Sequence, residues 1–114
     1  MIEVGEYVRT KDGKILKIDG FEKDLRNIEV VCFTTGEVYT REKLNEIIKN
    51  HSKNIIDLIE VGDYVNGVKV IEVGKYNFKT VEEYGLKIHH KKSVKIKSIV
   101  THEQFEAMKY KVEE

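Results

Sequence analysis

An internal repeat divides the sequence into two halves. The segment Ile2-Glu3-Val4-Gly5-Glu6-Tyr7-Val8 returns as Ile59-Glu60-Val61-Gly62-Asp63-Tyr64-Val65, and the copies differ only where Glu6 is replaced by Asp63. The two copies begin at positions 2 and 59, so they are separated by half the length of the 114-residue chain. A looser match follows in the same order, between residues 38–44 and residues 99–105, with a short insertion before it in the second half. Two matches in one order predict a duplicated unit, with copies in residues 1–57 and 58–114.

Each copy is small for an independent domain. A chain of about 57 residues buries only about 60% of its unfolded surface and is marginally stable by itself. We therefore expect the two halves to share an interface, or the chain to form a homodimer. We expect neither half to be stable alone.

The composition indicates a folded protein without a charge bias. Hydrophobic residues make up 40% of the chain and charged residues 35%, with 20 basic residues balanced by 20 acidic ones. This balance lacks the large positive excess of a typical nucleic-acid-binding domain. All three arginines, Arg9, Arg26 and Arg41, lie in the first half. Because arginine binds phosphate and carboxylate groups through two nitrogens, we expect the surfaces of the halves to differ.

Cysteine usage and hydropathy predict a cytoplasmic protein. Cys32 has no partner for an internal disulfide, and the apolar run at residues 28–33 predicts that it is a buried core residue. Met1 is followed by Glu3 and Glu6, unlike the start of a signal peptide. No apolar stretch approaches the roughly 20 residues that span a bilayer, so no membrane association is expected.

Short strands dominate the pattern of the first half. The predicted strands are residues 6–10, 14–18, 28–33 and 37–40. Asp12-Gly13 is a typical hairpin turn, and Asp19-Gly20 predicts another turn. Thr40 is a candidate N-cap for an amphipathic helix over residues 41–50. Residues 54–59 fit either a closing strand or a second short helix.

The second half repeats this plan. Its predicted strands are residues 64–65, 68–73, 78–81, 86–89, 94–100 and 110–112. Asn66-Gly67 is a hairpin dipeptide between the first two strands, and residues 82–85 connect the next two. Thr101 and Gln104 have the spacing of a capping box, which predicts a helix through Met108.

Four or five short strands with a helical turn before the last one are the element order of an SH3-like small barrel. We therefore predict a mainly β fold with short helices, built from two tandem SH3-like barrels that share an interface. The phrase Val-Gly-(Glu/Asp)-Tyr-Val, followed by a glycine turn, also resembles the first hairpin of such barrels, including the KOW type.

The titratable residues lack the spacing of a catalytic or metal site. The histidines His51, His89, His90 and His102 include no His-x-x-x-His pair, and His89 and His90 are expected on opposite faces of a strand. His102 is expected to be an exposed polar residue at the start of a helix. The sequence has no phosphate-binding glycine loop and no nucleophile motif. We therefore expect a protein that is not an enzyme and that uses no cofactor or metal.

The strongest local charge lies in residues 87–97, which contain five lysines and two histidines and no acidic residue. Lys91-Lys92 are expected at a hairpin turn, and Tyr76 and Tyr84 at loop tips, where aromatic rings stack on bases or dock on proteins. The candidate binding residues are Lys87, His89, His90, Lys91, Lys92, Lys95, Lys97, Tyr76 and Tyr84. This patch is suited to phosphates of nucleic acid or of a signalling nucleotide. The alternative is a solvated edge strand whose lysines prevent aggregation.

The runs from Ile55 to Gly67 and from Ile96 to Glu106 resemble a family of short proteins encoded by phages and prophages of clostridial-type Gram-positive bacteria. The resemblance covers most of the second half and the opening strand of the first, but not residues 19–46 and 76–92. It transfers no catalytic residues. It implies a non-enzymatic accessory protein that antagonises a host defence system in the host cytoplasm.

Two kinds of partner follow from this resemblance. One is a host protein, such as an immune effector of the CRISPR type, and the other is an immune signalling nucleotide. A different class of function is a nucleic-acid-binding module of the KOW or SH3-like type, and a third is a component of the virion. We expect partner contacts in the stretches that the resemblance does not cover.

Overall fold

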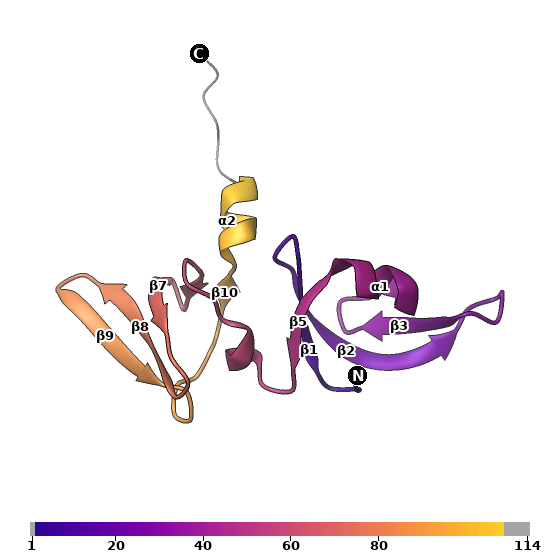
Figure 1. Cartoon of the computed structure of the whole chain (residues 1–114), viewed down its shortest axis with the longest axis horizontal. Helices are drawn as coiled ribbons and strands as arrows, with labels where there is room; N and C mark the ends of the chain where they lie inside the picture. The colour runs from indigo at the N-terminus through magenta and orange to yellow at the C-terminus, as the bar shows by residue number, and fades with distance from the viewer. Residues whose placement is uncertain (1, 109–114) are drawn as a thin grey trace, which may run out of the picture. The chain divides into compact units, whose positions relative to one another are not determined.

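The computed structural model describes residues 2–108, and its contacts divide the chain into two compact units, Met1–Leu58 and Ile59–Glu114 (Figure 1). Within the described residues each unit contains a five-stranded antiparallel sheet and one short α-helix, so the predicted mainly β fold is confirmed. The strand predicted at residues 110–112 lies outside the described residues. Among residues 2–108, no helix has the length and apolar character needed to cross a membrane.

The described part of the first unit contains five strands, one α-helix and one 3-10 helix. They are β1 (Tyr7–Thr10), β2 (Ile15–Lys23), β3 (Glu29–Phe33), β4 (Val38–Thr40), α1 (Arg41–Ile47), β5 (Ile48–Ser52) and η1 (Ile55–Leu58). The sheet order is β4-β3-β2-β1-β5, so the last strand pairs with the first. β2 pairs with β1 at its start and with β3 from Ile18 onward, and its register shifts between Ile18 and Gly20. Asp19-Gly20 is therefore a bulge within one long strand, and the predicted turn is wrong.

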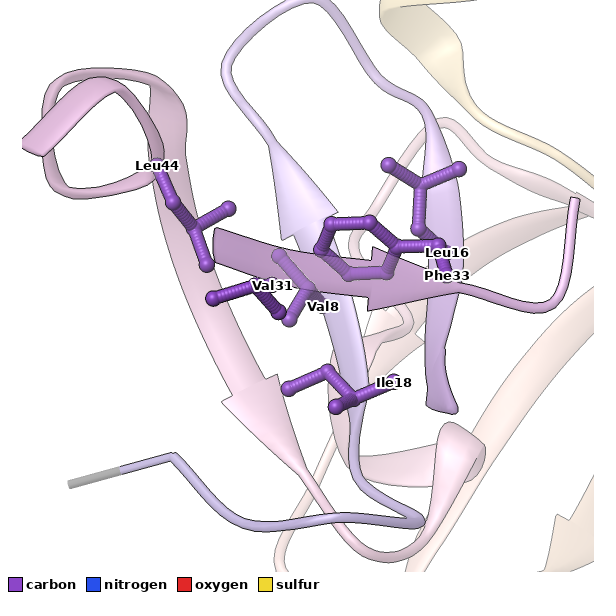
Figure 2. Close-up of a cluster of buried hydrophobic side chains, with 6 residues drawn as sticks. All are labelled: Val8, Leu16, Ile18, Val31, Phe33 and Leu44. Atoms are coloured by element: carbon purple, nitrogen blue, oxygen red, sulfur yellow. The ribbon is translucent and has the colours of Figure 1, made fainter. Parts of the chain in front are cut away.

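The core of the first unit is a cluster of buried apolar side chains from three strands and the helix (Figure 2). Its members are Val8, Leu16, Ile18, Val31, Phe33 and Leu44. Leu16 and Ile18 alternate along β2, as expected for a strand with one face on the core. Leu44 is 1% exposed and brings α1 onto the same cluster.

The helix of the first unit is shorter than predicted because a strand follows it directly. α1 ends at Ile47, and Ile48 begins β5, which pairs with β1. The Ile47 carbonyl accepts a hydrogen bond from the N–H of Lys11 (2.8 Å), at the point where the chain changes conformation. Of the two conformations predicted for residues 54–59, the structure has the short helix, η1.

The described part of the second unit contains five strands and one α-helix. They are β6 (Tyr64–Val65), β7 (Val68–Val73), β8 (Asn77–Glu82), β9 (Gly85–His90), β10 (Ile99–Val100) and α2 (His102–Met108). The sheet order is β10-β6-β7-β8-β9. In reverse, this order is β9-β8-β7-β6-β10. It matches the order of the first sheet, so that β6 corresponds to β1, β7 to β2, β8 to β3, β9 to β4 and β10 to β5. The predicted pairing of the strands around residues 82–85 is confirmed.

The helices of the two units occupy different places in the chain. α1 lies between β4 and β5, whereas α2 follows β10. β4 pairs with β3, but β10 pairs with β6. The looser sequence match, between residues 38–44 and 99–105, therefore aligns two strands that have different neighbours in their sheets. The two segments share only a strand that is followed by a helix with a threonine cap. In this respect the second unit does not repeat the plan of the first.

Most of the strand predicted at residues 94–100 is absent, and the side chain of Asn66 makes hydrogen bonds to the backbone of this segment instead. Only Ile99–Val100 forms a strand. The Asn66 side chain donates to the carbonyl of Lys95 (2.8 Å) and accepts from the N–H groups of Lys97 (2.7 Å) and Ser98 (3.2 Å). Asn66 has a positive φ of 51°, which asparagine tolerates in a tight turn. The turn between β6 and β7 thus holds an extended segment that is remote in sequence.

The close sequence repeat is also a structural repeat. The N–H of Gly5 donates to the Ile18 carbonyl (2.9 Å), and the N–H of Gly62 donates to the Val70 carbonyl (2.8 Å). The two glycines have φ values of 88° and 97°, which glycine adopts without strain. Each copy therefore begins with the same turn, bonded to the second strand of its own sheet.

The tyrosines of the repeat occupy matching strand positions. Tyr7 lies opposite Lys17 in β2, and Tyr64 lies opposite Lys69 in β7. Their contacts have diverged, because the Lys17 ammonium lies 5.4 Å from the Tyr7 ring centre, whereas the Tyr64 ring packs on Phe105 of α2 at 4.9 Å.

Both predicted threonine caps are present, and we expect the second to matter more. Thr40 Oγ1 accepts from the N–H of Lys43 (3.1 Å), and Thr101 Oγ1 accepts from the N–H of Gln104 (3.3 Å). Each Thr→Ala change is expected to lower the free energy of unfolding by about 0.5–2 kcal/mol. Thr101 is fully buried and Thr40 is not, so the loss should be larger for Thr101→Ala in denaturant titrations. Equal losses, or a larger one for Thr40→Ala, would contradict this expectation.

Candidate functional site

The candidate binding residues lie on and after the β8–β9 hairpin, whose outer strand is an edge of the sheet. β9 is one of the two terminal strands in the sheet order and pairs with β8 from Asn77↔His90 to Glu82↔Gly85. Because successive side chains of a strand point to opposite faces, Lys87 and His89 share one face of β9, and Leu86, Ile88 and His90 share the other. The partners of Lys87 and His89 across the ladder are the buried residues Thr80 and Phe78, so their face is the inner one.

The outer face of the hairpin is apolar and exposed. Leu86 is 64% exposed and Ile88 is 53% exposed. Val81 of β8 lies directly opposite Leu86 and is 46% exposed. Tyr84 is fully exposed in the turn between the two strands. Tyr84 was predicted as a binding residue, but Val81, Leu86 and Ile88 were not, although the alternation of Leu86 and Ile88 with polar residues along β9 was visible in the sequence.

The basic residues are divided between separate places. One group lies at the open end of the hairpin, where the N–H of Lys91 donates to the Tyr76 carbonyl (2.9 Å). His90 and Lys92, the residues before and after Lys91 in the chain, belong to the same group. Tyr84 and Lys87 lie toward the opposite, closed end. Lys91-Lys92 occupy a turn that follows β9 and leads into the segment held by Asn66, so the hairpin predicted around them is wrong.

The lysines of that segment remain exposed although it forms no strand there. Lys95 and Lys97 are exposed and alternate with the half-buried Val94 and Ile96. The predicted alternation of faces is therefore confirmed, while the strand that was expected to produce it is absent at residues 94–98.

His89 belongs to the interior of the second unit and not to the binding surface. Its ring stacks on Phe78, with ring centres 4.8 Å apart and planes 14° apart, and its Nε2 lies 2.8 Å from Thr80 Oγ1. Burial lowers the pKa of His89 below its usual value of 6.5, and Lys87 lowers it further, against an opposing effect of Glu82. The neutral imidazole is therefore the form that suits the fold.

This pKa shift predicts a loss of stability in mild acid. The pKa of His89 is lower in the folded protein than the unfolded value of 6.5. At a pH between these two pKa values, His89 therefore binds more protons in the unfolded chain than in the folded one. Stability should be complete above the unfolded value and should fall as the pH is lowered from 6.5 toward the folded-state pKa. In urea titrations, His89→Phe should remove this pH dependence, whereas His90→Gln, on the exposed face, should retain it. An unchanged pH dependence in His89→Phe would contradict the assignment.

The three arginines are engaged within the first unit and are not a surface for phosphate. Arg9 is fully buried, and its Nη1 donates to the carbonyl of Leu58 (2.8 Å). Arg26 pairs with Asp24 at 2.8 Å. Arg41 pairs with Glu29 at 2.7 Å and lies over the Phe21 ring. The arginine content of the first half thus reflects internal contacts.

Cys32 is only partly buried, contrary to the prediction of a core position. The side chains of β3 that fill the core come from Val31 and Phe33. Burial and the nearby carboxylates of Glu22 and Asp19 raise the pKa of the Cys32 thiol above its usual value, which disfavours a reactive thiolate.

A cavity in the first unit offers little unbalanced positive charge. Its volume is about 320 Å³, at the lower end for a small-molecule site. The lining residues include Lys11, Lys14, Lys43, Asp12 and Glu46. Lys14 also pairs with Glu37, and Lys43 pairs with Glu46. This cavity is poorly suited to the phosphates of a nucleotide.

A cluster of side chains that the sequence did not predict surrounds His102. Its Nε2 lies 2.9 Å from Glu60 Oε1 and 3.2 Å from Glu103 Oε1. His102 begins α2, as predicted, but it is partly buried and contacts two carboxylates, so it is not simply an exposed polar residue. Glu60 precedes His102 by 42 positions, so spacing along the chain gave no signal.

Comparisons with known proteins assign no family to the chain. No protein-family model, curated protein or solved structure matches it. The arrangement of its side chains is therefore the basis for a functional assignment.

Proposed function

We propose that this protein is a non-enzymatic binding protein that docks on a partner protein through β9 and the outer face of the β8–β9 hairpin. The resemblance to proteins of phages and prophages supports a role as an accessory protein that antagonises a host defence system, with a host immune effector as the partner. The hairpin falls within residues 76–92, where that resemblance stops and partner-specific contacts are expected.

The observation that carries this proposal is the contrast between two corresponding edge strands, β4 in the first unit and β9 in the second. β4, the edge strand of the first sheet that corresponds to β9 in the sheet order, has three residues, whereas β9 has six. Proteins usually shorten or cover an edge strand, because its unpaired backbone groups can pair with another chain. The long edge of the second unit also presents Leu86 and Ile88 to solvent.

The charge around this edge favours an acidic, extended partner segment. Between Tyr84 and His102 the sequence contains no acidic residue, and Lys87, His90, Lys91 and Lys92 follow or lie within β9. A partner strand added to β9 would gain backbone hydrogen bonds, while apolar and acidic side chains on it would match the surface. A signalling nucleotide is a poorer occupant, because the edge offers backbone pairing and apolar area.

The proposal is tested with matched variants of the two edge strands. Immobilised protein is challenged with host lysate, and any captured protein is then tested in purified form. Leu86→Lys combined with Ile88→Lys should abolish capture, whereas Val38→Lys, at an exposed apolar position of β4, should leave it unchanged. Capture that survives the double change, or that is lost equally in Val38→Lys, would contradict the proposal.

A nucleic-acid-binding module is the second candidate, and the observation that favours it is the set of lysines after β9, of which Lys92, Lys95 and Lys97 are exposed and Lys91 is partly buried. If they contact phosphates, binding should weaken steeply with salt, by about one unit of logarithmic slope per phosphate contacted. Changing Lys91, Lys92, Lys95 and Lys97 to Glu should then abolish a gel shift, whereas Lys23→Glu in the first unit should not. Absence of any shift at low salt would exclude this function.

A further inference from the structure

We propose that Glu60, His102 and Glu103 form a site for a first-row divalent cation of the zinc type. Among residues 2–108, this is the group of three ligand side chains whose donor atoms lie within 4.8 Å of one another. Imidazole nitrogen and carboxylate oxygen are both zinc ligands, and three protein ligands on a four-coordinate ion leave one position open for water or another ligand.

The distances between the donor atoms suit one ion. Zinc lies about 2.0–2.2 Å from nitrogen and oxygen ligands, so two ligand atoms on a tetrahedral ion are about 3.4 Å apart. His102 Nε2 is 2.9 Å from Glu60 Oε1 and 3.2 Å from Glu103 Oε1. Small side-chain movements would open these contacts around a cation.

The backbone that carries the ligands is held from beneath by one buried carboxylate. Asp63 is fully buried; its Oδ2 accepts from the N–H of Glu60 (2.8 Å), and its Oδ1 accepts from the N–H of His102 (2.9 Å). Gly62 leaves room for His102, because a Cβ at Gly62 would lie 3.2 Å from the Cβ of His102. Ligands positioned in this way lose little freedom when an ion binds.

The first copy of the repeat has diverged in the same region and provides an internal control. There the carboxylate of Glu3, which corresponds to Glu60, pairs with Lys53 at 2.9 Å. His51 Nδ1 lies 3.0 Å from Glu6, the residue that corresponds to Asp63. The first copy thus places a lysine and a histidine on its two carboxylates, and the second copy places one histidine between two glutamates.

The side chains are accessible to an ion from solvent. The exposed fractions of the side chains are 38% for His102, 31% for Glu60 and 15% for Glu103. The site can therefore load without unfolding, and its open position faces solvent, where a water or a side chain of a partner protein could complete the coordination.

The experiment uses the full chain, stripped with a chelator and titrated with Zn²⁺ by calorimetry and with Co²⁺ by visible absorption. We expect one ion per chain with micromolar affinity and a Co²⁺ spectrum of low coordination number. His102→Ala and Glu103→Gln should each weaken binding by at least about tenfold. His51→Ala and Glu3→Gln, the matched changes in the first copy, should leave affinity unchanged.

Three outcomes would overturn the proposal. The first is the absence of saturable binding below millimolar Zn²⁺. The second is an equal loss of Zn²⁺ affinity in His51→Ala and His102→Ala, and the third is wild-type Zn²⁺ affinity in Glu103→Gln. Circular dichroism of each variant separates a lost site from a lost fold, and Glu103→Gln keeps the proposal testable if His102→Ala does not fold. Wild-type affinity in Glu103→Gln would mean that the ion is not bound by the three proposed ligands.

Discussion

Replacing Phe78 with alanine should lower the free energy of unfolding of the second unit by about 3–5 kcal/mol. The Phe78 side chain is 1% exposed and stacks on His89, so its removal leaves a cavity that the short strands around it cannot readily close. A small unit has few other apolar contacts with which to absorb this loss. Denaturant titration of the full chain, followed by signals from each unit, measures the effect.

The same substitution should change His89. Since burial is the main cause of the lowered pKa of His89, opening a cavity beside its ring should move that pKa back toward 6.5. An NMR titration of the His89 ring in Phe78→Ala and in the wild type makes the comparison. Phe33→Ala, which removes a buried ring from the core of the first unit, is the matched control and should leave the His89 titration unchanged. A stability loss below 1 kcal/mol in Phe78→Ala would mean that the second unit has no tightly packed core at this position.

Replacing Asp63 with alanine should destabilise the second unit by a similar amount, about 3–5 kcal/mol. The carboxylate is fully buried and accepts two backbone hydrogen bonds, and a hydrogen bond to a charged group contributes about 1.5–3 kcal/mol. The change would also leave the N–H groups of Glu60 and His102 without this acceptor. Thermal and chemical unfolding of the full chain would report the loss.

Glu6→Ala provides the repeat-matched comparison for Asp63→Ala. Burial of the Glu6 carboxylate acts to raise its pKa, but hydrogen bonds from His51 and from the Glu3 N–H outweigh burial and lower the pKa below 4.5. Glu6 is 7% exposed, and its partner His51 reaches solvent, so a smaller loss is expected than for Asp63→Ala. If Asp63→Ala costs less than Glu6→Ala, the second turn is not held by its carboxylate in the way described.

The parts of the fold that sequence patterns predicted are those governed by local chemistry. The close repeat predicted a duplicated unit, and at its start the bonds of Gly5 and Gly62 are the same in both copies. The hairpin at residues 77–90 followed from alternation and a turn between two strands. Thr40 and Thr101 were predicted as caps because a cap depends only on the next three residues.

The parts that were missed depend on partners remote in sequence. Alternation at residues 94–98 suggested a strand, but the bonding partner is the Asn66 side chain, about thirty positions earlier. Ile48 fitted the spacing of a helix, yet pairing with β1 assigns it to a strand. His102 and Glu60 meet only because the turn at Asp63 and the start of α2 are bonded to each other. In the same way, the positive charge of residues 87–97 was visible in the sequence. The sequence did not show that these residues are divided between the two ends of the β8–β9 hairpin and the separate segment at residues 94–98.

Amide hydrogen exchange measured residue by residue, with and without a purified partner, tests most directly whether β9 is the binding edge. Strand addition would give new hydrogen bonds to the β9 amides that β8 leaves unpaired. We predict that the partner slows exchange within Gly85–His90 and leaves Val38–Thr40, the corresponding edge of the first unit, unchanged. Slowed exchange at Val38–Thr40, or unchanged exchange throughout Gly85–His90 under saturating partner, would contradict the account.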